Sequence, residues 1–109
     1  DIKDVEIFYA GDIDPSGFLI YHSLKKNYSD YNIQLFNNFY REMLKRGDKG
    51  YKIKTNQAKN RVVLETILQE FKNEEDRDLR KKINYLWKNN LRVPQEVITY
   101  EVLNGGKNY

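Results

Sequence analysis

The feature that most constrains this chain is a turn, Gly-Asp-Ile-Asp-Pro-Ser-Gly at positions 11–17, between an apolar stretch and a helical pattern. Residues 5–10 are β-branched and aromatic with nearly continuous apolar character, which predicts a strand covered on both faces. Asp14 suits the N-cap and Pro15 the first position of a helix through residue 27. Alternation over residues 31–36 predicts a second strand. A strand, turn, helix and strand in this order favour a right-handed crossover with parallel strands.

The rest of the sequence is mainly helical in pattern. We expect a short helix over 37–46 ended by Gly47, a long loop over 47–56 with a short strand at 51–53, and a short last helix from Pro94 to Gly105-Gly106. Two apolar stripes predict two further helices, the second with acidic residues 74–76 in its first turn: Val63, Leu64, Ile67, Leu68 and Phe71, and Leu79, Ile83, Leu86 and Trp87. The fold class is therefore α/β, a parallel sheet fragment with a helical C-terminal part. The length of 109 residues corresponds to a single domain over 1–109.

Asp12 and Asp14 are the residues most suggestive of chemistry. Side chains two positions apart in an extended chain project to the same side, so the two carboxylates can converge. Ligands of open α/β sheets bind beyond the carboxyl ends of the strands, where this turn lies. Two carboxylates suit Mg²⁺, or Mn²⁺, together with water and phosphate oxygens. The alternative is structural: Asp14 caps its helix and Asp12 serves a glycine turn.

Composition limits the other possibilities. The chain has no Cys and one His, so a metal must be held mainly by oxygen. No apolar stretch approaches the roughly 20 residues of a membrane helix, and the lack of Cys is compatible with the cytoplasm. Residues 1–30 contain 3 Lys/Arg and 6 Asp/Glu, whereas residues 41–61 are strongly basic. The basic residues of that segment are Arg41, Lys45, Arg46, Lys49, Lys52, Lys54, Lys59 and Arg61. They either bind DNA phosphates or form a solvated surface, and both alternatives stay open.

The segment Tyr9-Ala-Gly-Asp-Ile-Asp-Pro-Ser-Gly-Phe-Leu-Ile-Tyr21 resembles the Asp-x-Asp motif of Toprim domains. It is most similar to the G-D-x-D-P-x-G form of the JetD subunits of Wadjet anti-plasmid defence systems, and more distantly to topoisomerase VI A subunits. Arg92-Val-Pro-Gln-Glu96 resembles a terminal element of the bacterial relatives. The resemblance implies a Toprim-like (Rossmann-like) fold, a divalent metal on Asp12 and Asp14, and DNA phosphodiester chemistry.

One element of the Toprim pattern is absent from these residues. Toprim domains place a Glu after an earlier strand, and no such strand precedes Asp1. Glu96 is the one candidate for that acid/base role. The resemblance therefore implies that residues 1–109 are the C-terminal portion of a longer Toprim-containing protein.

The leading hypothesis is metal-dependent DNA cleavage in a bacterial defence or DNA-processing system, with DNA as partner and a homodimer or defence-complex subunits as possible protein partners. One alternative is a topoisomerase VI-like subunit that makes covalent strand breaks. The other is a non-catalytic DNA- or protein-binding module in which the Asp pair is structural.

Overall fold

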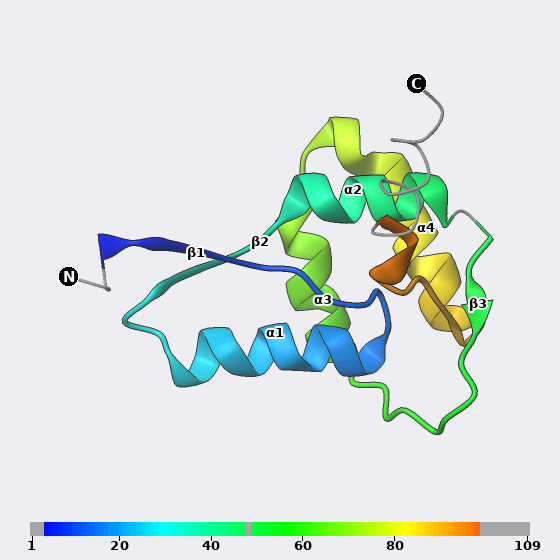
Figure 1. The fold of residues 1–109 in the computed structure, drawn as a ribbon, viewed down its shortest axis with the longest axis horizontal. Coiled ribbons are helices and arrows are strands. Elements are labelled where there is room, and N and C mark those ends of the chain that lie inside the picture. Colours follow the sequence, from blue (N-terminus) through cyan, green and yellow to red (C-terminus); the bar gives the residue numbers. More distant parts are fainter. Residues whose placement is uncertain (1–3, 48, 99–109) are drawn as a thin grey trace.

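The N-terminal third of the chain forms a parallel β-α-β unit. The computed structural model describes residues 4–47 and 49–98. Strand β1 (Glu6–Tyr9) pairs in parallel with β2 (Asn32–Leu35), and helix α1 (Pro15–Asn27) connects them. Figure 1 shows the two strands running side by side, with α1 alongside them. The predicted parallel pairing of two strands joined by a helix is confirmed.

Helix α1 begins where the sequence predicts. The Asp14 carboxylate accepts a hydrogen bond of 2.7 Å from the Gly17 N–H, and Pro15 follows as the first helical residue. Lys25 and Lys26 lie in the last turn, where positive charge interacts favourably with the helix dipole and stabilises the helix. The start of α1 is thereby set by a local hydrogen bond.

The remaining elements are mostly helical. Helix α2 (Asn37–Arg46) ends with Gly47 as its C-cap, as predicted, and the Gly47 N–H donates the last helical bond to the Met43 carbonyl. Helix α3 (Arg61–Glu70) and helix α4 (Arg77–Lys88) carry the two apolar stripes. The acidic residues 74–76 were expected in the first turn of α4; they form a separate 3₁₀ helix, η2 (Glu74–Asp76), immediately before it. Strands β3 (Tyr51–Lys52) and β4 (Leu91–Arg92) pair antiparallel.

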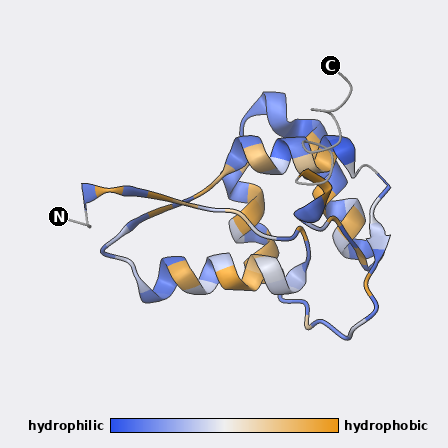
Figure 2. Ribbon diagram, viewed as in Figure 1, coloured by the Kyte–Doolittle hydropathy of each residue, from blue (hydrophilic) through white to orange (hydrophobic). Residues whose placement is uncertain are grey.

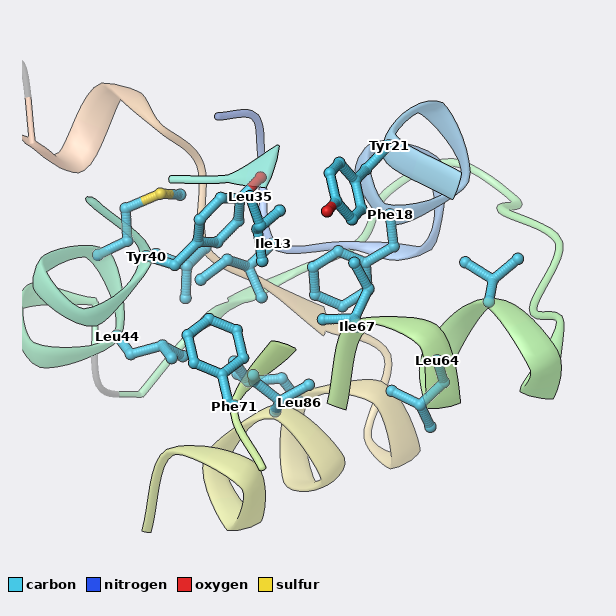
Figure 3. Close-up of a cluster of buried hydrophobic side chains, with 14 of the residues drawn as sticks. Ile13, Phe18, Tyr21, Leu35, Tyr40, Leu44, Leu64, Ile67, Phe71 and Leu86 are labelled. Atoms are coloured by element: carbon cyan, nitrogen blue, oxygen red, sulfur yellow. The ribbon is translucent and has the colours of Figure 1, made fainter. Parts of the chain in front are cut away.

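One hydrophobic core joins the β-α-β unit to the helices. Figure 3 shows side chains from α1, α2, α3 and α4 meeting around Ile13, and Figure 2 shows apolar residues alternating with polar ones along the helices. Phe18, Tyr21, Tyr40, Phe71 and Ile67 are each at most 1% exposed. Trp87, expected in the core, is partly buried at its margin and stacks on Phe18 with ring centroids 6.2 Å apart. Large aromatic rings supply much of the buried area of this small core.

The exposure of β1 and the extent of the sheets differ from what the sequence predicts. Strand β1 is not covered on both faces, because Phe8 is 52% exposed and Val5 before it is 54% exposed. In the described residues the sheets are two separate pairs of short strands, so the fold is mixed α/β and mostly helical. Helical residues follow Pro94 at 96–98, and the predicted end of that helix lies outside the described residues. No helix among the described residues is long and apolar enough to cross a membrane.

Candidate functional site

The acidic turn is fixed to the segment after β4. The Ile13 N–H donates to the Val93 carbonyl at 2.8 Å, and the Val93 N–H donates back to the Ile13 carbonyl at 3.1 Å. The Ile13 side chain is 1% exposed and enters the core. Because successive side chains of an extended segment alternate in direction, Asp12 and Asp14 project away from the core on the other side. The two carboxylates therefore share one side of the turn, as predicted.

Asp14 is the more buried of the two acids. Its Oδ1 accepts the 2.7 Å capping bond from Gly17, and its Oδ2 accepts a long hydrogen bond of 3.5 Å from Gln57 Nε2. The Gln57 side chain is itself held by the Ser16 N–H, which donates to Oε1 at 3.0 Å. With an exposure of 5%, Asp14 has little direct access to water.

Asp12 is more accessible and faces the C-terminal segment. Its Oδ1 accepts a hydrogen bond of 2.8 Å from the Gln95 N–H, and its Oδ2 accepts one of 2.9 Å from Arg92 Nη2. The side chain is 30% exposed. Asp12 is therefore the acid that solvent reaches more readily.

Arg92 connects both acids. Its Nη2 lies 2.9 Å from Asp12 Oδ2, and its Nε lies 3.4 Å from Asp14 Oδ2. The Nε–H is buried and has no partner of hydrogen-bonding geometry within the described residues. One guanidinium thus lies against an oxygen of each carboxylate, so the two Oδ2 atoms face the same positive charge. We call this arrangement the shared cation position of Asp12 and Asp14.

Two tyrosine hydroxyls form hydrogen bonds with the backbone at the two ends of the turn. The Gly11 N–H donates to Tyr40 Oη at 2.8 Å, and Tyr9 Oη donates to the Gly17 carbonyl at 3.2 Å. Burial first, and then the negative charges of Asp12 and Asp14, raise the pKa of the Tyr9 hydroxyl. Burial also raises the pKa of Tyr40, which the bond from Gly11 partly offsets. Both hydroxyls are therefore neutral near pH 7.

The donor set fits a hard divalent ion. Within the described residues there is no group of three or more His, Cys, Asp or Glu side chains placed to hold a metal. Two carboxylates that already share one cation position are sufficient for Mg²⁺, which retains several waters and takes phosphate oxygens as further ligands. Asp12 and Asp14 are the residues that would hold it.

The other predicted site residues are dispersed. Glu96 is exposed, and it is the neighbouring Gln95 backbone that contacts Asp12. Arg41 pairs with buried Asp76 at 3.0 Å. Arg46 pairs with Glu42 and Arg61 with Glu65, in each case one turn away in the same helix. Lys49 lines a surface hollow with Lys81, Lys82 and Tyr85. Lys59 lines another, polar hollow together with Gln57.

Arg92, Gln57 and Gln95 are the site residues whose contacts sequence reasoning missed. Arg92 and Gln95 belong to the segment that resembles a terminal element of the bacterial relatives. The resemblance drew attention to this segment but did not indicate that its residues contact Asp12. Gln57 lies in the long loop and has no pattern that indicates its contact. These contacts join residues 41 to 83 positions apart.

Fold and site together define a small mixed α/β domain that presents two carboxylates just beyond the carboxyl end of a parallel strand. The chain belongs to the family described as Wadjet protein JetD, C-terminal, whose model matches residues 1–105. This membership confirms the predicted relation to JetD and indicates a bacterial anti-plasmid defence context. Neither the curated proteins nor the solved structures include a significant match to this chain. The wider relation to Toprim domains and topoisomerase VI stays a prediction.

Proposed function

We propose that this chain carries the acidic half of a metal-dependent DNA-cleaving site of the Toprim type that serves anti-plasmid defence. The observation that carries the proposal is the shared cation position between Asp12 Oδ2 and Asp14 Oδ2, just beyond β1. Such a position at the carboxyl end of a parallel strand is where α/β proteins bind phosphate-containing ligands. The family description supports the biological setting.

In this proposal Asp12 and Asp14 hold Mg²⁺ or Mn²⁺. An ion held there would supply Lewis-acid polarisation of a phosphodiester and charge stabilisation of the leaving oxygen. Arg92 and the polar side chains around Gln57 bind the DNA backbone, and Lys59 adds positive charge in the hollow that Gln57 also lines. Glu96, at the edge of the same segment, is the candidate acid/base, and a preceding part of a longer protein is the alternative source of that group.

The test is cleavage of supercoiled plasmid by the protein that contains this chain, with and without Mn²⁺ or Mg²⁺. Asp12→Asn removes the charge of the accessible acid at nearly constant shape, and we expect loss of metal-dependent cleavage by at least about a hundredfold with an unchanged circular dichroism spectrum. Asp30→Asn is the matched control, because Asp30 is an exposed aspartate in the turn between α1 and β2. Equal cleavage by the Asp12→Asn variant and wild type would refute the proposal.

A second candidate function rests on a different aspect of the same contacts. All four carboxylate oxygens of Asp12 and Asp14 already have a partner, as they would in a non-catalytic DNA- or protein-binding module with a structural Asp pair. Unchanged carboxyl NMR signals of both acids at millimolar Mg²⁺, together with salt-sensitive DNA binding, would favour this function.

A topoisomerase VI-like covalent mechanism is the remaining alternative. The neutral hydroxyls of Tyr9 and Tyr40 hydrogen-bond to the backbone around the acidic turn, which favours a supporting role for both. Detergent trapping during plasmid cleavage separates the mechanisms, because a covalent protein–DNA adduct supports strand breakage by tyrosine and its absence supports hydrolysis.

Two further proposals concern partners and location. A second copy of the chain or other subunits of the Wadjet defence complex are its proposed protein partners, and the cytoplasm is its proposed location. Co-purification of the tagged chain with other Wadjet subunits, and its native mass when purified alone, test the first.

A further inference from the structure

Arg92 occupies the position that a divalent ion would need. Its guanidinium lies 2.9 Å from Asp12 Oδ2 and 3.4 Å from Asp14 Oδ2. The other oxygen of each acid accepts a backbone N–H, from Gln95 and from Gly17. Backbone donors are fixed by the fold, whereas a side chain can change rotamer. Gln57 makes only a long hydrogen bond of 3.5 Å to Asp14 Oδ2, so Arg92 is the charged partner that must leave before both Oδ2 atoms can bind a metal ion.

The contact between Arg92 and Asp14 is incomplete. Arg92 Nε–H is buried and lacks a partner of hydrogen-bonding geometry within the described residues. A buried N–H without a partner is unfavourable, so Arg92 is held by its hydrogen bond to Asp12 and, towards Asp14, by charge attraction alone. An arginine held in this way moves more readily than one with every donor satisfied.

A place for a phosphate lies beside the acids. Gln57, which contacts both Asp14 and the Ser16 backbone, also lines a polar hollow of about 240 Å³. Its other lining residues are Ile53, Thr55, Asn56, Lys59 and Asn90. The β3–β4 pairing places this hollow next to the strand that carries Arg92, because the Ile53 N–H donates to the Asn90 carbonyl at 3.1 Å. Amide groups and a lysine are suitable donors for a phosphodiester oxygen.

We propose that Arg92 is a displaceable counterion that blocks the metal position in the absence of DNA and binds the DNA phosphate once a divalent ion takes that position. This inference rests on the proposed metal site. The positive charge of Arg92 repels a divalent ion at Asp12 and Asp14, and the negative charge of a bound phosphate offsets this repulsion. Metal and DNA therefore bind cooperatively, and by linkage each raises the affinity for the other by the same factor.

The first experiment measures Mn²⁺ affinity of the protein that contains this chain by electron paramagnetic resonance, with and without a short DNA duplex. Wild type is compared with Arg92→Gln and Arg92→Lys. Removal of the positive charge is expected to raise Mn²⁺ affinity without DNA about tenfold or more. Arg92→Lys is expected to lie between, since an ammonium cannot reach both acids in the way a guanidinium does. The enhancement of Mn²⁺ binding by DNA should be large in wild type and small in Arg92→Gln.

Arg77→Gln is the matched control, because Arg77 is an exposed arginine at the start of α4 whose side chain faces Glu74. It should leave the Mn²⁺ affinity without DNA unchanged. Comparison with this variant separates the specific effect of Arg92 from a general change in net charge.

The second experiment needs no substitution. The Arg92 Nε–H should give a slowly exchanging NMR signal in the metal-free protein, and this signal should shift or broaden into solvent exchange when Mg²⁺ is added.

The outcomes distinguish this inference from the proposed function. Equal Mn²⁺ affinity of wild type and both Arg92 variants, or an unchanged Nε–H signal while the Asp12 carboxyl signal responds to Mg²⁺, would overturn the role of Arg92 and leave the metal site intact. Lack of specific Mn²⁺ binding by wild type and every variant, with and without DNA, would overturn the metal site itself.

Discussion

Replacement of Gly17 by alanine tests how tightly the acidic turn is built. In the first turn of a helix such as α1, alanine is normally favoured over glycine by up to about 1 kcal/mol. Here a Cβ atom on Gly17 would lie 2.2 Å from the Asp12 carbonyl oxygen and 3.1 Å from Asp14 Oδ1. The first of these contacts is with backbone, so the turn itself has to move. We therefore expect the sign of the usual glycine-to-alanine effect to reverse.

The expected magnitude follows from two opposing terms. Overpacking a well-packed site costs about 1–3 kcal/mol, and a clash with backbone belongs at the upper end of that range. Subtraction of the helix preference leaves a net destabilisation of about 2 kcal/mol. For a domain of this size that corresponds to a fall in melting temperature of about 8 °C. Because Gly17 also donates the capping bond to Asp14, the variant should shift the Asp14 carboxyl NMR signal.

The assay is thermal and urea denaturation followed by circular dichroism, with Ser16→Ala as the control. Ser16 is the exposed neighbour in the same helical turn, and its replacement should change stability by no more than about 0.5 kcal/mol. A Gly17→Ala variant as stable as wild type, or more stable, would show that the turn relaxes freely and that the close approach described here does not constrain the carboxylates.

Two further predictions concern buried polar groups. Burial, and then the hydrogen bond to Glu70, raises the pKa of Tyr21 above its usual value. Above about pH 10 the unfolded chain therefore loses a proton that the folded chain keeps, and the free energy of unfolding should fall as the pH rises. In urea denaturation between about pH 10 and pH 11 the Tyr21→Phe variant should lose about 1 kcal/mol less than wild type, and equal losses would contradict this assignment. Arg41→Ala leaves the buried Asp76 carboxylate without its ion pair and should destabilise the fold by about 3 kcal/mol. The control is Arg61→Ala, which removes an exposed ion pair, and equal losses of stability in the two variants would contradict the role of Arg41.

Features fixed by neighbouring residues were predictable from the sequence. The start of α1 follows from Asp14 and Pro15, and the end of α2 follows from Gly47, because each depends on hydrogen bonds within one helical turn. The shared side of Asp12 and Asp14 follows from backbone geometry alone.

Features fixed by distant contacts were not predictable. The ion pairs of Arg92 and the position of Gln57 depend on which segments pack together, and composition or periodicity carries no information on that packing. The exposure of Phe8 has the same origin, since an apolar strand pattern does not reveal what covers each face. The acidic residues 74–76 form a 3₁₀ turn of their own, and sequence periodicity does not distinguish such a turn from the first turn of α4.

The reciprocal backbone bonds between Ile13 and Val93 have a consequence for synthesis of the chain. The acidic turn leaves the ribosome 80 residues before Arg92, which later balances its charge. Until then the two carboxylates repel one another and lack both the Arg92 and the Gln95 contact. A chain truncated before Val93 therefore lacks the backbone bonds that hold Ile13 and the contacts that hold Asp12. If the proposed cleavage activity is correct, its acidic turn reaches the final arrangement only after the segment that follows β4 has been synthesised.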